Sequence, residues 1–206
     1  NGAPAGWAVD LTNALGQVMG LKVNFDIGTF DNILPAVKAG KDDIGVSSFT
    51  DTLEREQQVD FVNYYSAGIQ WAAPKGKTVD PDNACGLKVA VQATTYQDTH
   101  EVPAKSKACT DAGKPAITIF KYDAQDQATN ALVVGQVDAM SADSPVTLYA
   151  ISKTKDKLQT AGDAFEVAPY GMPVAKDSEF TPVLQKALQT LIDDGTYNKI
   201  LSKWGV

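Results

Sequence analysis

Segments with the period of a β-strand alternate with segments with the period of an α-helix along most of this 206-residue chain. Helical patterns of apolar residues lie over 9–19, 30–37, 124–132, 180–192 and 196–204, and strand patterns lie over 21–25, 43–46, 87–91, 116–120 and 137–140. Such alternation is typical of α/β proteins, in which helices pack on the faces of a sheet. The sequence therefore predicts an α/β fold.

Two connecting stretches divide these elements into two series. The stretch 70–76 leads out of the first series, and 170–174 leads back to it. We expect lobe 1 to comprise 1–70 completed by 171–206, and lobe 2 to comprise 71–170. Two crossings between lobes permit a hinge, and small ligands commonly bind in the cleft between such lobes.

The composition excludes several classes of protein. Hydrophobic residues make up 44% of the chain, enough for one large core or two small ones. The net charge is −7 and no stretch is dense in Lys or Arg, so a nucleic-acid partner is not expected. No apolar run approaches the roughly 20 residues of a membrane span. The sequence begins Asn1-Gly2 without an initiator Met, so we expect a processed or trimmed product.

The two cysteines bear on the compartment of the protein. Cys85 and Cys109 form no Cys-x-x-Cys motif, and His100 is the only histidine, so neither zinc nor another metal or cofactor is expected. Turn residues lie beside each cysteine, at Gly86 and at 111–113, which favours a disulfide over a buried free pair. A disulfide would place the protein outside the cytosol.

Arg55 is the only arginine, because 17 of the 18 Lys and Arg residues are lysines. Its planar guanidinium can hold a carboxylate through two parallel hydrogen bonds, which a lysine cannot match. The hydroxyls of Ser48 and Thr50 stand just upstream. Together these side chains predict a site for a carboxylate, although a surface arginine on a short helix is the alternative.

The predicted local structure around Arg55 supports an anion site. The strand over 43–46 runs directly into these residues, and ligands of open α/β sheets bind beyond the carboxyl ends of strands. Asp51-x-x-Glu54 resembles a capping box, which would place Arg55 in the first turn of a helix. An ordinary N-cap cluster would use the same residue types.

Asp143 lies in an equivalent position in the second series. It follows the strand over 137–140 and precedes Pro145, which is typical of the start of a helix. As an N-cap residue it would need no ligand. His100 lies in a stretch predicted as helix surface, so we expect a solvated histidine rather than a general base.

Four motifs resemble those of the bacterial extracellular amino-acid-binding proteins of family 3, the polar-amino-acid receptors of ABC importers. Gly6-Trp7-Ala8-Val9-Asp10-Leu11 resembles their Gly-Phe-Asp-Val-Asp-Leu opening. The segment 30–37 resembles their Phe-Asp-x-Leu-Ile-Pro-x-Leu helix, 47–61 resembles their Ser-Ser-x-x-x-Thr-x-x-Arg-x-x-x-x-x-Phe run, and 194–200 resembles their C-terminal signature. The resemblance covers essentially the whole chain. It implies a two-lobed, type II periplasmic-binding-protein-like fold with a hinge and an interlobe ligand cleft.

The resemblance also implies roles for single residues. Arg55 would clamp the α-carboxylate of an amino acid, and Asp143 would hold its α-ammonium. Hydroxyls from both lobes would assist with the carboxylate, and Phe30 would pack on the ligand side chain. The hydroxyl residues implied are Ser48, Thr50, Thr94 and Thr95. Closing ionic groups away from water requires that each be paired, so binding would favour a closed form.

Two departures from the family pattern have consequences. The family has a leading strand before the Gly-Phe-Asp motif, whereas only residues 1–5 precede that motif here. We therefore expect another chain, or a segment outside this sequence, to fill a gap between 22–26 and 43–46. Ala8 stands where the family commonly has a carboxylate, so part of a polar contact is expected to be lost.

The leading interpretation is a non-enzymatic amino-acid receptor in the periplasm or at the cell surface as a lipoprotein, working with the membrane permease of an ABC importer. A ligand-binding module of a receptor or sensor kinase is the first alternative, but the chain ends at the family's C-terminal signature. A dehydratase-like enzyme is the second. No Ser-His-Asp set, Gly-x-Ser-x-Gly motif or phosphate loop supports it. Phe30 suits a long or planar ligand side chain, such as that of glutamine or arginine, and the identity of the amino acid stays open.

Overall fold

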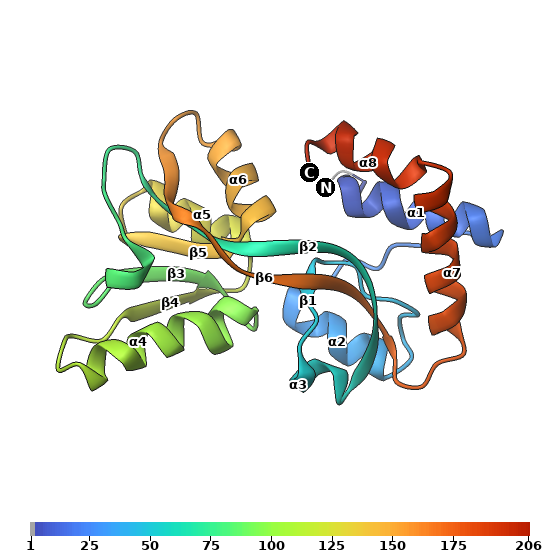
Figure 1. Ribbon diagram of the computed structural model, residues 1–206, viewed down its shortest axis with the longest axis horizontal. Helices are drawn as coiled ribbons and strands as arrows, with labels where there is room; N and C mark the ends of the chain where they lie inside the picture. Colours follow the sequence, from blue (N-terminus) through green and yellow to red (C-terminus); the bar gives the residue numbers. More distant parts are fainter. Residues whose placement is uncertain (1–2) are drawn as a thin grey trace. The chain divides into compact units, whose positions relative to one another are not determined.

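The computed structural model describes residues 3–206, which fold into two compact units (Figure 1). Of the described residues, 3–65 and Pro169–Val206 form unit 1, and Ser66–Ala168 form unit 2. Two long strands, β2 (Val59–Pro74) and β6 (Leu158–Ala175), each begin in one unit and end in the other. The main chain therefore crosses between the units within extended strands.

Unit 1 is mainly helical. Its elements are α1 (Trp7–Met19), α2 (Phe30–Lys38), β1 (Phe49–Thr50), α3 (Leu53–Glu56), α7 (Phe180–Asp193) and α8 (Thr196–Trp204), with parts of β2 and β6. Helices α1, α7 and α8 pack against one another, and Leu11, Leu15, Leu184 and Leu188 are buried. β1 pairs antiparallel with β6, with Phe49 opposite Gly171. This pairing fixes the residues that lead into α3.

Two strands predicted in unit 1 are not formed. The segment 21–29 contains no strand, and Leu21 and Ile27 are exposed. Of the segment 43–46, only Ile44 makes a β-bridge, antiparallel to Val174. A strand needs a partner for its backbone hydrogen bonds, and the alternating pattern of 21–25 meets none in the described chain.

Unit 2 is an α/β sandwich. β3 (Lys88–Gln92) runs parallel to β4 (Thr118–Tyr122) and to β5 (Ala139–Asp143), and β2 pairs antiparallel with β5. The helices are η1 (Pro81–Asn83), η2 (Gln97–Glu101), α4 (Val102–Asp111), α5 (Gln125–Val133) and α6 (Ser144–Lys153). The strand predicted over 137–140 lies two to three residues later, so that Asp143 is the last residue of β5.

Helices cover both faces of this sheet, as the alternation of side chains along β3 shows. Val89 and Val91 belong to the core that includes Val102 of α4, whereas Ala90 belongs to the core that includes Leu132 of α5. Successive strand residues point to opposite faces, so a short apolar strand can fill two cores at once. The expectation of an α/β sheet covered by helices is confirmed.

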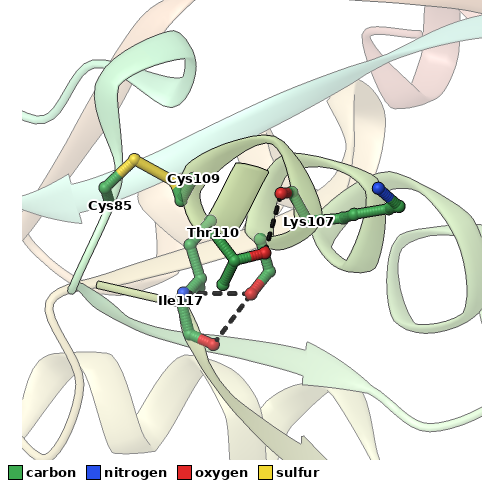
Figure 2. Close-up of a disulfide and its surroundings, with 6 residues drawn as sticks. Cys85, Lys107, Cys109, Thr110 and Ile117 are labelled. Carbon is green, nitrogen blue, oxygen red and sulfur yellow. Dashed lines mark hydrogen bonds between the residues drawn. A yellow bond between two sulfur atoms is a disulfide. The ribbon is translucent and has the colours of Figure 1, made fainter. Parts of the chain in front are cut away.

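A disulfide joins Cys85 to Cys109 in unit 2 (Figure 2). The bond closes a loop with a sequence separation of 24, which would contribute about 3–4 kcal/mol on the loop-entropy account. In the same helix as Cys109, Ser106 Oγ accepts a hydrogen bond from Ile117 N at 3.0 Å, which ties α4 to the residue before β4. The predicted disulfide is confirmed, and the alternative of a free pair is wrong.

Candidate functional site

Unit 1 holds the guanidinium of Arg55 against two stacked aromatic rings. Arg55 Cζ lies 5.4 Å from the centre of the Phe49 ring and 5.9 Å from that of Phe30. The two rings are stacked, with centres 4.3 Å apart and an interplanar angle of 19°. Arg55 Nη1 also donates to the carbonyl oxygen of Thr50 at 2.7 Å. The structure thus brings the predicted site residues Phe30, Thr50 and Arg55 together. It adds Phe49, which the sequence analysis did not include among the site residues.

The helix that carries Arg55 begins one residue later than predicted. Thr52, not Asp51, is the N-cap of α3, and its Oγ1 accepts from Arg55 N at 3.2 Å. Asp51 instead accepts from Asn63 Nδ2 at 2.9 Å. The capping box Asp51-x-x-Glu54 is therefore wrong, because Asp51 is drawn toward β2. Arg55 still lies in the first turn of the helix, as the sequence predicted.

Two of the predicted site residues have a left-handed backbone conformation. Ser48, half-buried before β1, has φ 52°, and Thr94, exposed after β3, has φ 63°. Positive φ is unfavourable for a β-branched residue such as threonine, and such strain is concentrated at functional sites. Ser48 and Thr94 are both predicted site residues, whereas four other residues with positive φ are not: Lys155, Asp156, Glu166 and Asp177.

In unit 2, Thr94 and Thr95 form the turn between β3 and η2. Thr95 Oγ1 donates to Gln92 O at 2.7 Å, and it lies 3.3 Å from the amide nitrogen of Asp98. Thr94 N donates to Asp98 Oδ2 at 2.9 Å. These hydrogen bonds hold the turn in a single shape despite the positive φ of Thr94.

Asp143 stands at the end of β5 and at the N-cap position of α6. Its side chain does not cap that helix. Oδ1 accepts instead from Gln97 Nε2 at 2.6 Å. The structure therefore brings Asp143 together with the turn that carries Thr94 and Thr95, all within unit 2. An ordinary N-cap role for this carboxylate is not observed.

A buried polar turn that sequence reasoning missed lies behind these residues. Gln97, Asp98 and Glu101 of η2 are only 2%, 4% and 3% exposed. Glu101 accepts from Trp71 Nε1 at 3.1 Å and from Ser141 Oγ at 2.9 Å. The sequence signal was the spacing of polar residues at 97, 98 and 101, which places them on one face of a helical turn.

Burial raises the pKa of the Glu101 carboxyl to about 7. The hydrogen bonds from Ser141 and Trp71 and the charge of Lys105 act in the opposite direction, and the charge of Glu166 adds to the rise. Desolvation outweighs the donors because the carboxyl lies almost entirely out of contact with water.

His100 belongs to η2. It is exposed and stacks on Tyr96, with ring centres 5.0 Å apart, and its Nδ1 lies 2.8 Å from Thr99 Oγ1. Across residues 3–206, no cluster of three or more His, Cys, Asp or Glu residues is arranged to hold a metal ion. Over the same residues, no helix is both long and apolar enough to cross a membrane.

A shallow pocket of about 280 Å³ lies elsewhere on unit 1, between α1 and α8. Its lining includes Asp10, Gln17 and Lys199, and it contains none of the predicted site residues. Asp10 accepts hydrogen bonds from Lys203 at 2.6 Å and from Trp204 at 2.9 Å, and these lower the pKa of its carboxyl. The pocket lies between two helices of unit 1.

Comparisons with known proteins agree along the whole chain. The family model described as bacterial extracellular solute-binding proteins, family 3, matches residues 1–206. The arginine-binding protein ArgT of Corynebacterium glutamicum is 41% identical over 208 residues, covering 100% of this chain and 68% of that protein. The ABC transporter glutamine-binding protein GlnH of Bacillus subtilis is 27% identical over 212 residues, covering 99% of this chain and 74% of that protein. Among solved structures, an ancestral arginine-binding protein bound to arginine has a TM-score of 0.89 and 34% identity, covering 99% of this chain and 89% of that one.

Proposed function

The chain belongs to family 3 of the bacterial extracellular solute-binding proteins, and from this membership we propose that it is a receptor that binds a free polar amino acid and delivers it to an ABC importer. The names of two relatives support this proposal, since one is an arginine-binding protein and the other a glutamine-binding protein of an ABC transporter. The family is one of extracellular binding proteins, so the receptor acts outside the cytoplasm. We place it in the periplasm or at the cell surface as a lipoprotein.

The observation that carries the proposal is a pair of opposite charges, Arg55 in unit 1 and Asp143 in unit 2, each held by contacts within its own unit. A zwitterionic amino acid needs a cation with hydrogen-bond donors for its carboxylate and an anion for its ammonium. Unit 1 offers Arg55 on its aromatic stack, and unit 2 offers Asp143 at the end of β5. In our proposal one amino acid is bound by Ser48, Thr50, Arg55, Thr94, Thr95, Asp143 and Phe30.

The two strands that run from one unit to the other support a hinge. In our proposal the lobes move as 1–70 with 171–206, and as 71–170, with β2 and β6 bending between them. A ligand that satisfies Arg55 and Asp143 together has different contacts in the open and closed forms. Binding therefore shifts the equilibrium toward closure.

The ligand side chain that fits best in this proposal is that of L-arginine. Phe30 is half-buried, and one face of its ring stacks on Phe49. In this proposal Phe30 packs on the ligand side chain. Planar cationic groups bind well to aromatic faces. L-Glutamine, with a planar amide, is the second candidate. The similarity to ArgT, at 41% identity, favours arginine.

The partner that would complete unit 1 is a β-strand from another chain or from a segment outside this sequence. Leu21, Phe25 and Ile27 are exposed in a segment without a strand, and Ile44 makes an isolated antiparallel bridge with Val174. An added strand between 22–26 and 43–46 would pair both backbones. Hydrogen exchange of the amides over 22–27 tests this in protein isolated from its natural host: protection is expected, and fast exchange in the ligand-loaded protein would rule the strand out.

The role of Arg55 is tested by the substitution Arg55→Lys. A lysine keeps the charge but loses the paired hydrogen bonds, so the affinity for L-arginine should fall by about 30-fold or more. The affinity for L-argininamide, which has no carboxylate, should fall by less than about 3-fold. Lys38→Arg, on an exposed position of the same unit, is the reciprocal control. Equal losses for the two ligands, or no loss, would remove Arg55 from the carboxylate site.

A further inference from the structure

We propose that Gln97 is a positioning residue for ligand binding: its side-chain amide fixes the orientation of the Asp143 carboxylate toward the α-ammonium group of the amino acid. This inference rests on the proposed function and deepens it, because it assigns the ammonium end of the site a second residue.

The contact itself is short and partly buried. Gln97 Nε2 donates to Asp143 Oδ1 at 2.6 Å, and the Gln97 side chain is only 2% exposed. The donor is an uncharged amide, so it orients the carboxylate without neutralising its charge. A lysine or arginine at this position would pair with the negative charge that the ammonium group needs. A glutamine at this position can therefore orient the carboxylate without competing with the ammonium group for its negative charge.

The turn that carries Gln97 is anchored on two further sides. Asp98 accepts from Thr94 N at 2.9 Å and pairs with Lys121 at 2.8 Å. The anchored stretch is a π-helical turn, a geometry that is rare and frequent at functional sites. Its hydrogen bonds therefore connect the ammonium end of the site to the strained threonine turn.

Glu101 supplies the second anchor, which reaches the same strand that carries Asp143. Ser141 Oγ donates to Glu101 Oε2 at 2.9 Å, and Trp71 Nε1 donates to Glu101 Oε1 at 3.1 Å. Trp71 and Ser141 are opposite each other in the β2–β5 ladder, two residues from Asp143. Donor and acceptor of the Gln97–Asp143 bond are thus fixed to one rigid piece of sheet.

Orientation matters because the last torsion of an aspartate is soft. The terminal rotation of a carboxylate has a broad energy profile, unlike the staggered wells of aliphatic torsions. A carboxylate that already points along the productive direction loses less freedom when the ligand binds. Removing the amide should therefore weaken the ammonium contact even though Asp143 itself is intact.

The test compares Gln97→Met with Gln125→Met by calorimetry. Gln125 donates to the sulfur of Met140 on the same strand β5, so its replacement removes an equal amide without touching Asp143. With L-arginine, Gln97→Met should lose about 10-fold in affinity and Gln125→Met less than about 2-fold. With 5-guanidinovaleric acid, which lacks the α-ammonium, Gln97→Met should also lose less than about 2-fold. Equal loss for both ligands, or no loss for either, would overturn the proposal.

A ligand-free crystal structure of Gln97→Met supplies the second readout. We expect the Asp143 carboxylate to adopt more than one orientation there, whereas one unchanged orientation would overturn the positioning role by itself. Failure of the proposed function has a different signature, since the wild-type protein would then bind neither L-arginine nor L-glutamine. That outcome would also remove the ligand role of Gln97, whatever orientation Asp143 adopts.

Discussion

Thr94 has a backbone conformation that lowers the stability of the folded protein and fixes the position of its side chain. Its φ of 63° lies in the left-handed region, where a β-branched side chain crowds the backbone. The cost of such a conformation is about 1–3 kcal/mol. The Asp98 carboxylate, which accepts from the Thr94 amide, holds the backbone there. The strain is consistent with a hydroxyl kept at one place for a ligand.

Replacing Thr94 by glycine should separate stability from binding. Glycine adopts positive φ without strain, so the free energy of unfolding should rise by about 1 kcal/mol. Affinity for L-arginine should fall, because the hydroxyl is lost. Lys155→Gly is the control, since Lys155 is exposed with φ 48° and should gain stability without a change in affinity. Urea unfolding and calorimetry measure the two quantities, and unchanged affinity in Thr94→Gly would exclude Thr94 from the site.

For single residues, the sequence was most informative about residue types that are rare in this chain or stand at an unusual position. A single arginine after two hydroxyl residues pointed to Arg55, and a carboxylate after a strand pointed to Asp143. Their roles in binding stay predictions. Gln97 and Glu101 were missed because polar residues in a helical stretch normally face solvent. Their burial depends on packing of the turn against the sheet, which includes the hydrogen bonds of Glu101 with Trp71 and Ser141.

Among the elements, the π-helical turn η2 carries a carboxyl with a strongly raised pKa, that of Glu101. Burial raises the pKa of Glu101 to about 7, from an ordinary value of 4.5. Between these two values the folded protein holds a proton that the unfolded chain releases. The contribution of this group to stability is therefore greatest below pH 4.5, declines as pH rises toward 7, and is lost above the folded pKa.

The substitution Glu101→Gln should flatten this pH dependence. In the wild-type protein the shift corresponds to a loss of about 3 kcal/mol in the free energy of unfolding between pH 4.5 and pH 7.5. The variant cannot titrate at this position, so the difference between the two pH values should shrink by about that amount. Urea unfolding at both values measures it, with Glu179→Gln at an exposed position of unit 1 as control. Parallel pH profiles for wild type and Glu101→Gln would contradict the shifted pKa.

Helices were more predictable than strands for a physical reason. The apolar stripe of α7 and the turn chemistry at Gly195 are local, and the predicted range 180–192 ends one residue before the observed helix. The stretch 21–25 has the alternation of a strand, yet it forms none, because strand formation depends on a partner elsewhere. Boundaries shifted by two or three residues at β4 and β5 because helix and strand signals overlap there.

At the scale of the whole molecule, the chain belongs to a family of solute-binding proteins. Its two units are joined by two strands, an arrangement that suits a receptor. The α/β class and the disulfide followed from sequence patterns. The division into lobes at 70/71 and 170/171 stays a prediction about motion, because a hinge position depends on which backbone bends and not on residue type. The net charge of −7 is consistent with a cationic ligand such as L-arginine.

The most direct test is a calorimetric titration of the purified protein with each standard amino acid, L-arginine and L-glutamine included. We expect saturable binding of one or a few polar amino acids, with L-arginine the tightest and with affinity lost in Arg55→Lys. Binding of L-glutamine alone would change the identity of the ligand and keep the receptor function. Absence of heat across the whole panel, from protein that unfolds cooperatively in urea, would contradict an amino-acid receptor.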